Sequence, residues 1–207
     1  MLKKENIRTI VCGAYQVNAY LVCPEGRDDA FLVDPGDDLA RLQEAVAQSG
    51  RKLSAILLTH GHFDHILAAQ PLSEAFDAPV YIHAADAEML DDPSKSAYMA
   101  EVCRLAPPDD LDYQVYDLTI DVCGEKMQVL STPGHSRGSV CLYQNGMLFC
   151  GDTLFCAGYG RTDLHGGSDA EMIRSLKRLF TLPDETVCLC GHGPSTTIGN
   201  ERRRYGL

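Results

Sequence analysis

The chain alternates short apolar runs with polar segments that contain glycine or proline. Runs such as "AYLVC", "AFLVDPG", "SAILLTH", "KMQVLSTPG" and "GMLFCGD" have the length and the flanking turn residues that are typical of strands. Helical spacing occurs between them, most clearly over residues 39–49, where Leu42 and Val46 fall on one face. The pattern therefore predicts strands and helices that alternate along one chain.

Turn and cap residues sharpen these boundaries. "QNG" at 144–146 predicts a tight hairpin, because Asn-Gly accepts the positive φ angles of such a turn. Asp37 and Asp38 are candidate N-caps for the helix over 39–49, and a second helix is expected to follow His65 toward Phe76. "SDAE" predicts a capping box in which Ser168 precedes a third helix and Glu171 lies three residues on.

These elements predict a mixed fold with both hairpins and helical crossovers. The polar, proline-rich stretch over 91–112 is expected to run over the surface, not to separate two cores. We therefore expect one domain over residues 1–207.

Composition and charge narrow the functional classes. The chain has 18 Lys and Arg against 29 Asp and Glu, a net charge of −11, which disfavours nucleic acid as a partner; solubility is the simplest explanation of this charge. No apolar run approaches the length of a membrane span, and residues 1–10 do not resemble a signal peptide, so we expect a cytoplasmic protein with no membrane partner. Nine cysteines are scattered through apolar runs, which indicates core thiols in a reducing compartment.

The segment "THGHFDH" concentrates the chain's candidate chemistry. His60 and His62 follow an apolar strand and are two residues apart, so in extended chain they face the same side. Asp64 and His65 fall where a helix begins and can address a second position. Imidazole and carboxylate together suit Zn²⁺, Mn²⁺ or Fe²⁺. Three exposed histidines without a metal are the alternative, which the density of this motif disfavours.

Three later residues follow the same arrangement. His135 in "STPGHSRGS", Asp152 in "LFCGDTLF" and His192 in "LCGHGP" each follow an apolar run and adjoin glycine. Side chains at several strand ends would meet on one rim of a sheet. Asp152 is the natural bridge between two cations, because its carboxylate can give one oxygen to each.

This order of motifs resembles the metallo-β-lactamase fold superfamily, and "GDTLFCAGYGRTD" and "GHGPSTTIGNE" resemble its short glyoxalase II-like hydrolases. The resemblance covers nearly the whole chain and implies an α+β, four-layer αββα sandwich with the metal site at one edge. It implies one metal on His60, His62 and His135, and a second on Asp64, His65 and His192. Asp152 would bridge them.

The resemblance also implies an activity. Two divalent cations, zinc above iron or manganese, would share a hydroxide that attacks a thioester such as S-lactoylglutathione. Asp64 is the expected catalytic residue that orients this hydroxide. The expected partner is a small-molecule thioester, and the protein is expected to be a monomer or a homo-oligomer.

Arg161 is the candidate substrate-binding residue, since a basic residue at this position in glyoxalase II enzymes binds a carboxylate of the thiol carrier; a loop ion pair with Asp163 is the alternative. We expect no C-terminal helical domain after Leu207 of the kind that grips glutathione in longer relatives. The chain also has Gly193 and Pro194 where those enzymes place an aromatic residue. We therefore expect a more open site.

Further residues have two readings each. Asp34 in "LVDPG" either supports a metal-ligand histidine or initiates a turn. Thr59 and Ser139 either hydrogen-bond around the site or end strands. For His83 we favour a structural or exposed role, and for Cys190 packing in the core. For His165 a role near the substrate loop and a structural role are equally favoured.

Other activities remain as alternatives. A persulfide dioxygenase-like enzyme with one iron shares the histidine motif and a similar "GRTD" loop. A lactonase or other ester hydrolase would use the same metal pair. β-Lactamase activity is less favoured because no export signal is expected. An RNA-processing nuclease is less favoured because the chain is acidic, and a metal-storage role because an open coordination position is expected.

Overall fold

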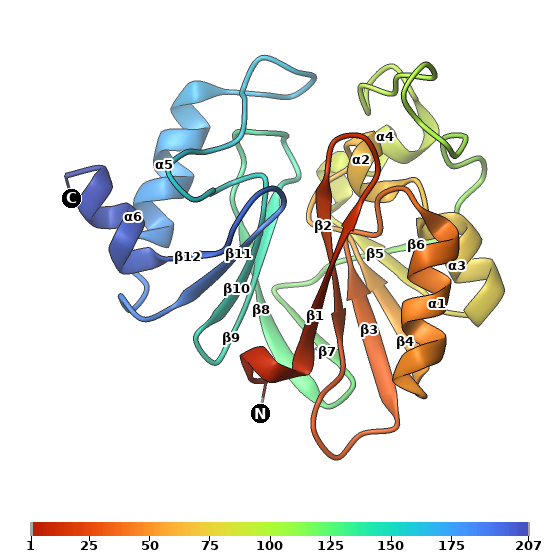
Figure 1. Cartoon of the computed structure of the whole chain (residues 1–207). Helices are drawn as coiled ribbons and strands as arrows, with labels where there is room; N and C mark the ends of the chain where they lie inside the picture. The colour runs from red at the N-terminus through yellow and green to blue at the C-terminus, as the bar shows by residue number, and fades with distance from the viewer. Residues whose placement is uncertain (1, 207) are drawn as a thin grey trace.

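The computed structural model describes residues 2–206 and consists of two packed β-sheets with helices on both outer faces (Figure 1). Each sheet has six strands, in the orders β1-β2-β3-β4-β5-β6 and β12-β11-β10-β9-β8-β7. The layers run helix, sheet, sheet, helix, which confirms the four-layer α+β sandwich.

The N-terminal half forms the first sheet and its helices. Strands β1 to β3 are antiparallel neighbours, whereas β3 to β6 are parallel. The elements are η1 (Lys4–Asn6), β1 (Ile7–Cys12), β2 (Val17–Val22), β3 (Asp29–Val33), α1 (Leu39–Ser49), β4 (Lys52–Leu57), α2 (Phe63–Ile66), α3 (Ala69–Phe76), β5 (Val80–Ile82), η2 (Ala84–Asp86), α4 (Glu88–Asp91) and β6 (Tyr113–Val115).

The C-terminal half forms the second sheet, which is antiparallel except for the parallel pair β10 and β11. Helices α5 and α6 cover its outer face (Figure 1). The elements are β7 (Thr119–Val122), β8 (Glu125–Ser131), β9 (Val140–Gln144), β10 (Met147–Gly151), α5 (Asp169–Leu179), β11 (Val187–Cys190), β12 (Thr196–Thr197) and α6 (Ile198–Arg204).

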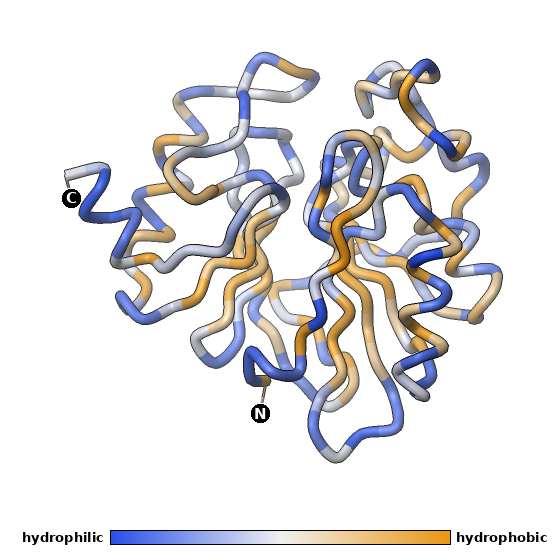
Figure 2. Tube along the Cα trace, viewed as in Figure 1, coloured by the Kyte–Doolittle hydropathy of each residue, from blue (hydrophilic) through white to orange (hydrophobic). Residues whose placement is uncertain are grey.

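Alternate residues of the central strands serve two different cores. In β2, Ala19 and Leu21 pack in the cluster under α1 and α3, whereas Tyr20 and Val22 pack between the sheets. All six residues of β2 are buried, because the strand is covered on both faces. The hydrophobic colouring of Figure 2 accordingly concentrates along the strands.

The second sheet follows the same rule. Phe149 faces the inner core, whereas Leu148 and Cys150 face the layer of α5 and α6. Cys141, Cys150, Cys188 and Cys190 all belong to this outer cluster, and all nine cysteines are free. The prediction that most cysteines are core thiols is therefore confirmed for the six that are buried: Cys12, Cys123, Cys141, Cys150, Cys188 and Cys190.

Local predictions are confirmed with two corrections. The hairpin turn has φ angles of 50° at Asn145 and 79° at Gly146. The helix expected from His65 to Phe76 is divided into α2 and α3, which is the first correction. The second is that only half of the capping box forms: Ser168 Oγ accepts the N–H of Glu171, but the Glu171 carboxylate pairs with Arg174.

The helix over 39–49 is confirmed as α1, but its N-cap works differently from the expectation. Asp38 occupies the N-cap position with a φ of 64° and makes no side-chain cap. Its carboxylate instead accepts the N–H of Gly13, at 2.9 Å, in the loop between β1 and β2. The acidic residue thus ties two loops together at the end of the first sheet.

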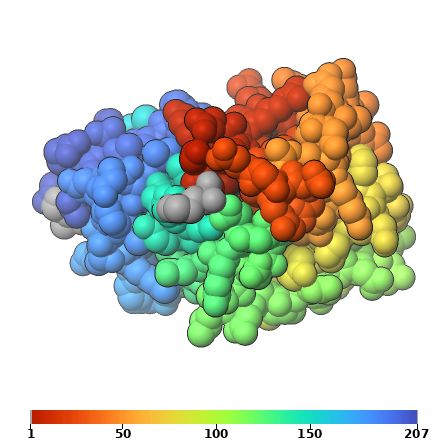
Figure 3. All heavy atoms as spheres, turned by 90° about the horizontal axis from the view of Figure 1, so that it is seen from below, coloured from red at the N-terminus to blue at the C-terminus, as the bar shows by residue number. Residues whose placement is uncertain are grey.

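The polar stretch after α4 continues to β6 and extends over the end of the sandwich, above α2 in Figure 1. It makes one direct backbone contact with the candidate site, since Phe63 N–H donates to the Ser96 carbonyl at 2.9 Å. Seen from below, the N-terminal segment lies at the junction of the two halves of the chain (Figure 3). Within residues 2–206, no helix is both long and apolar enough to cross a membrane.

Candidate metal centre

The predicted ligands meet at one edge of the sandwich because their strands end there. Strands β3 and β4 are parallel neighbours, as are β10 and β11, so the residues that follow each pair lie side by side. Strand β8 runs in the same direction as β10, because both are antiparallel to β9. The two sheets face each other, which brings both sets of strand ends together (Figure 1).

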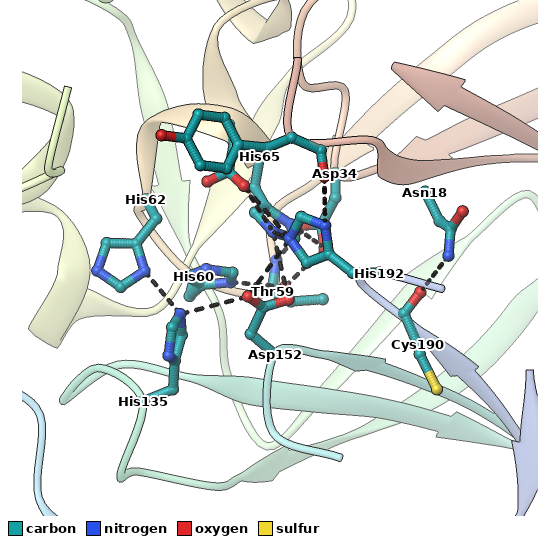
Figure 4. Close-up of polar contacts among 12 residues, drawn as sticks. Asn18, Asp34, Thr59, His60, His62, His65, His135, Asp152, Cys190 and His192 are labelled. Atoms are coloured by element: carbon teal, nitrogen blue, oxygen red, sulfur yellow. Dashed lines mark hydrogen bonds and ion pairs between the residues drawn. The ribbon is translucent and has the colours of Figure 1, made fainter. Parts of the chain in front are cut away.

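All seven predicted ligands lie in this one cluster, and Figure 4 labels six of them. Three groups have mutually close ligand atoms, all within 4.8 Å. Two are the predicted ones, His60 with His62 and His135, and Asp64 with His65 and His192; the third joins Asp34 to His60 and His65. Asp152 lies between them, with Oδ2 3.5 Å from His135 Nε2 and Oδ1 3.3 Å from His65 Nε2. The structure thus brings together the side chains of both predicted groups and places Asp152 between them; that each group binds a metal ion and that Asp152 bridges them stays a prediction.

The spacing of these atoms suits a bound cation. Two ligands on one tetrahedral ion at about 2.1 Å lie about 3.4 Å apart. His65 Nε2 and His192 Nε2 are 3.3 Å apart, and His192 Nε2 is 3.3 Å from Asp64 Oδ2. His62 Nδ1 and His135 Nε2 lie closer, at 2.7 Å, which is a hydrogen-bond length.

Asp34 holds one ligand of each group through a short chain of hydrogen bonds. Its carboxylate accepts Nδ1–H of His65 at 3.0 Å, and both the N–H and the hydroxyl of Thr59 at 2.7 Å. Since the Thr59 hydroxyl donates to Asp34, its free lone pair accepts Nδ1–H of His60 at 3.0 Å. Both rings therefore present Nε2, with its lone pair, to the site. Asp34 thus supports the histidines instead of acting only as a turn residue.

Two further rings are oriented by backbone carbonyls. His135 Nδ1 lies 2.7 Å from the carbonyl oxygen of Arg161, and His192 Nδ1 lies 2.9 Å from that of Tyr15. These contacts also fix the Nδ1–H tautomer and direct Nε2 inward. The sequence could not reveal them, since a main-chain carbonyl carries no residue-specific signal.

Several buried atoms have no hydrogen-bond partner among the described residues. They include His60 Nε2, His62 Nε2 and Asp152 Oδ1. A buried polar atom without a partner is costly, so it needs a ligand or an ion. His60 Nε2 and Asp152 Oδ1, which lie in a cluster of imidazoles and carboxylates, fit divalent cations, whereas His62 turns its Nδ1 atom toward the cluster.

The electrostatics of the cluster differ between its two sides. Burial lowers the pKa of His60 well below its usual range and lowers that of His62 to about 3, so both rings are neutral. Burial disfavours the charged form of His65 and of His192, but the nearby carboxylates of Asp152 and Asp64 outweigh this effect. They raise the pKa of His65 well above its usual range and raise that of His192 to about 9. The acidic side thus requires positive charge, which a metal ion can supply.

The cluster opens into a cleft of about 430 Å³. Five candidate ligands line its floor: His62, Asp64, His135, Asp152 and His192. Its walls are mainly apolar and come from distant segments: Tyr15, Phe63, Ala97, Met99, Phe155, Gly160, Arg161 and Leu164. The stretch over 91–112, expected only as a surface excursion, therefore supplies part of the cleft wall.

Arg161 reaches the cleft but is already paired. Its guanidinium contacts both carboxylate oxygens of Asp163, at 2.7 and 2.8 Å. The loop ion pair weighed from the sequence is thus present, and a role for Arg161 in binding substrate stays a prediction.

The remaining candidate residues, His83, His165 and Cys190, are not part of the ligand cluster. His83 accepts the N–H of Ala85, which gives it a structural role in η2, and His165 pairs with Glu88 at 3.0 Å. Cys190 is buried, and its carbonyl accepts the hydroxyl of Tyr20 at 2.5 Å. The same carbonyl accepts the amide of Asn18 at 3.0 Å (Figure 4). Packing therefore accounts for Cys190.

Comparison with known proteins gives consistent matches. The family model of the metallo-beta-lactamase superfamily matches residues 12–192. The hydroxyacylglutathione hydrolase GloC of Haemophilus influenzae is 31% identical over 205 residues, with 96% of this chain and 95% of that protein covered.

Two solved structures are similar over nearly their full length. TTHA1623, in a di-iron-bound form, has a TM-score of 0.84 and 40% identity, covering 95% of this chain and 97% of that one. The BLEG-1 B3 metallo-beta-lactamase has a TM-score of 0.86 and 35% identity, covering 95% and 96%. The chain therefore belongs to the metallo-beta-lactamase superfamily.

Proposed function

We propose that this protein is a metal-dependent hydrolase of small-molecule thioesters that holds two divalent cations. One observation carries the proposal: five histidines and two aspartates converge from both sheets in one cluster that opens into a cleft, with four rings held by their Nδ1 atoms so that Nε2 faces the site. Such a pair of cations supplies an activated water and a Lewis acid for a carbonyl oxygen.

His60, His62 and His135 would hold the first cation, and Asp64, His65 and His192 the second, with Asp152 between them. Zinc suits this set, and iron is supported by the di-iron form of TTHA1623. Asp64 has a second role in this proposal. It lines the cleft and would accept a hydrogen bond from the attacking water, which orients that water toward the substrate.

The chemistry of the cleft favours a thioester. Apart from the candidate ligands, the side-chain donors that line it are Tyr15 and Arg161. A thiolate needs little protonation when it leaves, so a thioester makes the smallest demand on a general acid. The similarity to a hydroxyacylglutathione hydrolase supports this substrate class.

The test combines metal analysis with a substrate panel. Protein loaded with zinc or iron is assayed with S-lactoylglutathione, a neutral thioester of the same acyl group, a lactone and a chromogenic cephalosporin. We expect two metal equivalents per chain and the highest kcat/KM on a thioester. Two bound metals without thioester turnover would refute the substrate class, and oxygen uptake with a persulfide would favour the dioxygenase alternative.

Asp64→Asn separates binding from orientation. We expect this variant to lose at least tenfold in kcat. Its metal content is measured on the same preparation, so that a loss of metal can be distinguished from a loss of water orientation. Unchanged metal content and an unchanged rate would contradict the proposed role of Asp64.

β-Lactam hydrolysis is the second candidate, because the similarity to the BLEG-1 enzyme extends over nearly the full length of both chains. Turnover of the cephalosporin above that of every thioester would establish it in place of the first.

A further inference from the structure

A buried carboxylate outside the predicted ligand set contacts both loops that carry the first group of histidines. Asp86 ends η2 and is 1% exposed. Its Oδ1 accepts the N–H of Gly138 at 2.6 Å. Its Oδ2 accepts the N–H of Gly61 at 3.1 Å and the hydroxyl of Ser136 at 2.5 Å. Three donors from two separate loops therefore converge on one side chain.

Two of these donors adjoin candidate ligands in the sequence, and the third, Gly138, lies three residues after His135. Gly61 lies between His60 and His62, and Ser136 directly follows His135. The first loop follows β4 of one sheet, and the second follows β8 of the other. Asp86 thus joins the two backbone segments that must keep a fixed separation for all three rings to address one ion.

The packing leaves little freedom at these contacts. A Cβ atom on Gly138 would lie 2.7 Å from Asp86 Cγ, and one on Gly61 would lie 3.0 Å from the Asp86 carbonyl oxygen. The loop of Gly138 therefore approaches Asp86 more closely than a residue with a side chain allows, and the loop of Gly61 leaves almost no space for a Cβ atom between Asp86 and Met89, whose Cβ would lie 2.7 Å from it. Ser136 is further fixed by Ser139, whose Oγ accepts the Ser136 N–H at 3.1 Å.

We propose that Asp86 is a positioning residue for the first cation, because it sets the distance between the loop of His60 and His62 and the loop of His135. The inference rests on the proposed function, since it requires that these three histidines bind a metal. Outer residues that orient ligands commonly change metal affinity by about 10–100-fold when they are substituted.

The test is a zinc titration in competition with a chromogenic chelator, made on the full chain and on a His192→Ala background that retains the first group of ligands. Asp86→Asn places an amide NH₂ against a backbone or hydroxyl donor. We expect it to weaken zinc binding to the first group by about 10–100-fold in both backgrounds. Ser136→Ala removes one donor of three and should weaken binding roughly fivefold.

Asp37→Asn is the matched control. Asp37 is also buried, at 4% exposed, and it accepts two backbone N–H groups, from Asp38 and Arg104, each at 2.8 Å. These bonds hold neither loop of the first group, so this variant should lose thermal stability but keep its zinc affinity.

The outcomes separate the two proposals. Zinc binding by the wild-type protein with unchanged affinity in the Asp86→Asn variant would overturn the positioning role alone. Equal losses of zinc affinity in the Asp86→Asn and Asp37→Asn variants would show that Asp86 contributes only to general stability, and would overturn the positioning role as well. A wild-type chain that binds no zinc or iron would overturn the proposed function together with this inference. If Asp86→Asn does not fold, the comparison of Ser136→Ala with Asp37→Asn decides.

Discussion

Asp34 and His65 form a buried carboxylate–imidazole pair, with Asp34 Oδ2 3.0 Å from His65 Nδ1. The same carboxylate accepts two hydrogen bonds from Thr59, whose hydroxyl in turn contacts His60. One residue at the end of β3 therefore controls the tautomer of a ring in each predicted metal group. This arrangement makes Asp34 a sensitive point for both metal binding and stability.

The first prediction concerns this pair. Asp34→Asn keeps the size of the side chain but turns an NH₂ toward Thr59 or His65, so one buried donor is left without an acceptor. We expect a loss of about 1–3 kcal/mol in the free energy of unfolding and about 10–100-fold weaker metal binding. Urea unfolding of the metal-free protein and chelator competition measure the two effects. Asp29→Asn, which alters a pair with Arg27 nearer the surface, should change neither by much.

The second prediction compares two histidines. His192→Ala removes a ligand of the second group and should reduce the bound metal from two equivalents to about one, with at least a hundredfold loss of kcat. His165→Ala removes a ring that contacts Glu88 outside the cluster, so it should retain both equivalents. Elemental analysis after gel filtration gives the count. Retention of two equivalents in His192→Ala would contradict the assignment of His192.

The third prediction tests the cation at the cleft. If Arg161 binds a substrate carboxylate, it must exchange its Asp163 partner for that carboxylate. Asp163→Asn should then lower KM for S-lactoylglutathione, and Arg161→Gln should raise it severalfold. Neither change should affect KM for a neutral thioester of the same acyl group, nor the metal content. Equal shifts on both substrates would indicate a loop effect in place of charge recognition.

The fourth prediction concerns the buried thiols. Burial raises the pKa of Cys12 and of Cys123 to about 12. Burial also raises the pKa of Cys23 and of Cys103, but by less, and these two thiols and Cys156 are only partly buried. In the native protein at pH 8, iodoacetamide should therefore modify Cys23, Cys103 and Cys156 but leave Cys12 and Cys123 unmodified. Mass spectrometry of native and urea-unfolded samples locates the labels.

The same shift predicts how stability depends on pH. A thiol whose folded pKa is raised contributes stability that is complete below its unfolded pKa near 9 and is lost as pH rises toward 12. The free energy of unfolding should fall over that range, and Cys12→Ala should reduce the slope. An identical slope in this variant would contradict the contribution of Cys12.

The pattern of apolar residues predicted much of the fold, because positions that are buried in the folded protein are occupied mainly by apolar residues. Residues such as Leu21 and Tyr20 are both apolar since β2 is covered on both faces, and "QNG" marks a turn whose dihedral angles few other residues accept. The break between α2 and α3 was not predicted. Pro71, the third residue of α3, is the local signal for this break, because proline has no N–H to bond to the carbonyl of Leu67 and is tolerated in the first turn of a helix but not in its interior.

The sequence by itself determined the chemistry of this protein: which imidazoles and carboxylates follow strand ends, and hence a candidate two-metal set that includes His60, Asp152 and His192. Only the tertiary structure decided how they are held. The carbonyls of Tyr15 and Arg161 orient two rings, and Asp86 joins two loops that are distant along the chain. Main-chain acceptors are the same for every residue type, and contacts between distant segments depend on the packing of both sheets, so neither leaves a local signal in the sequence.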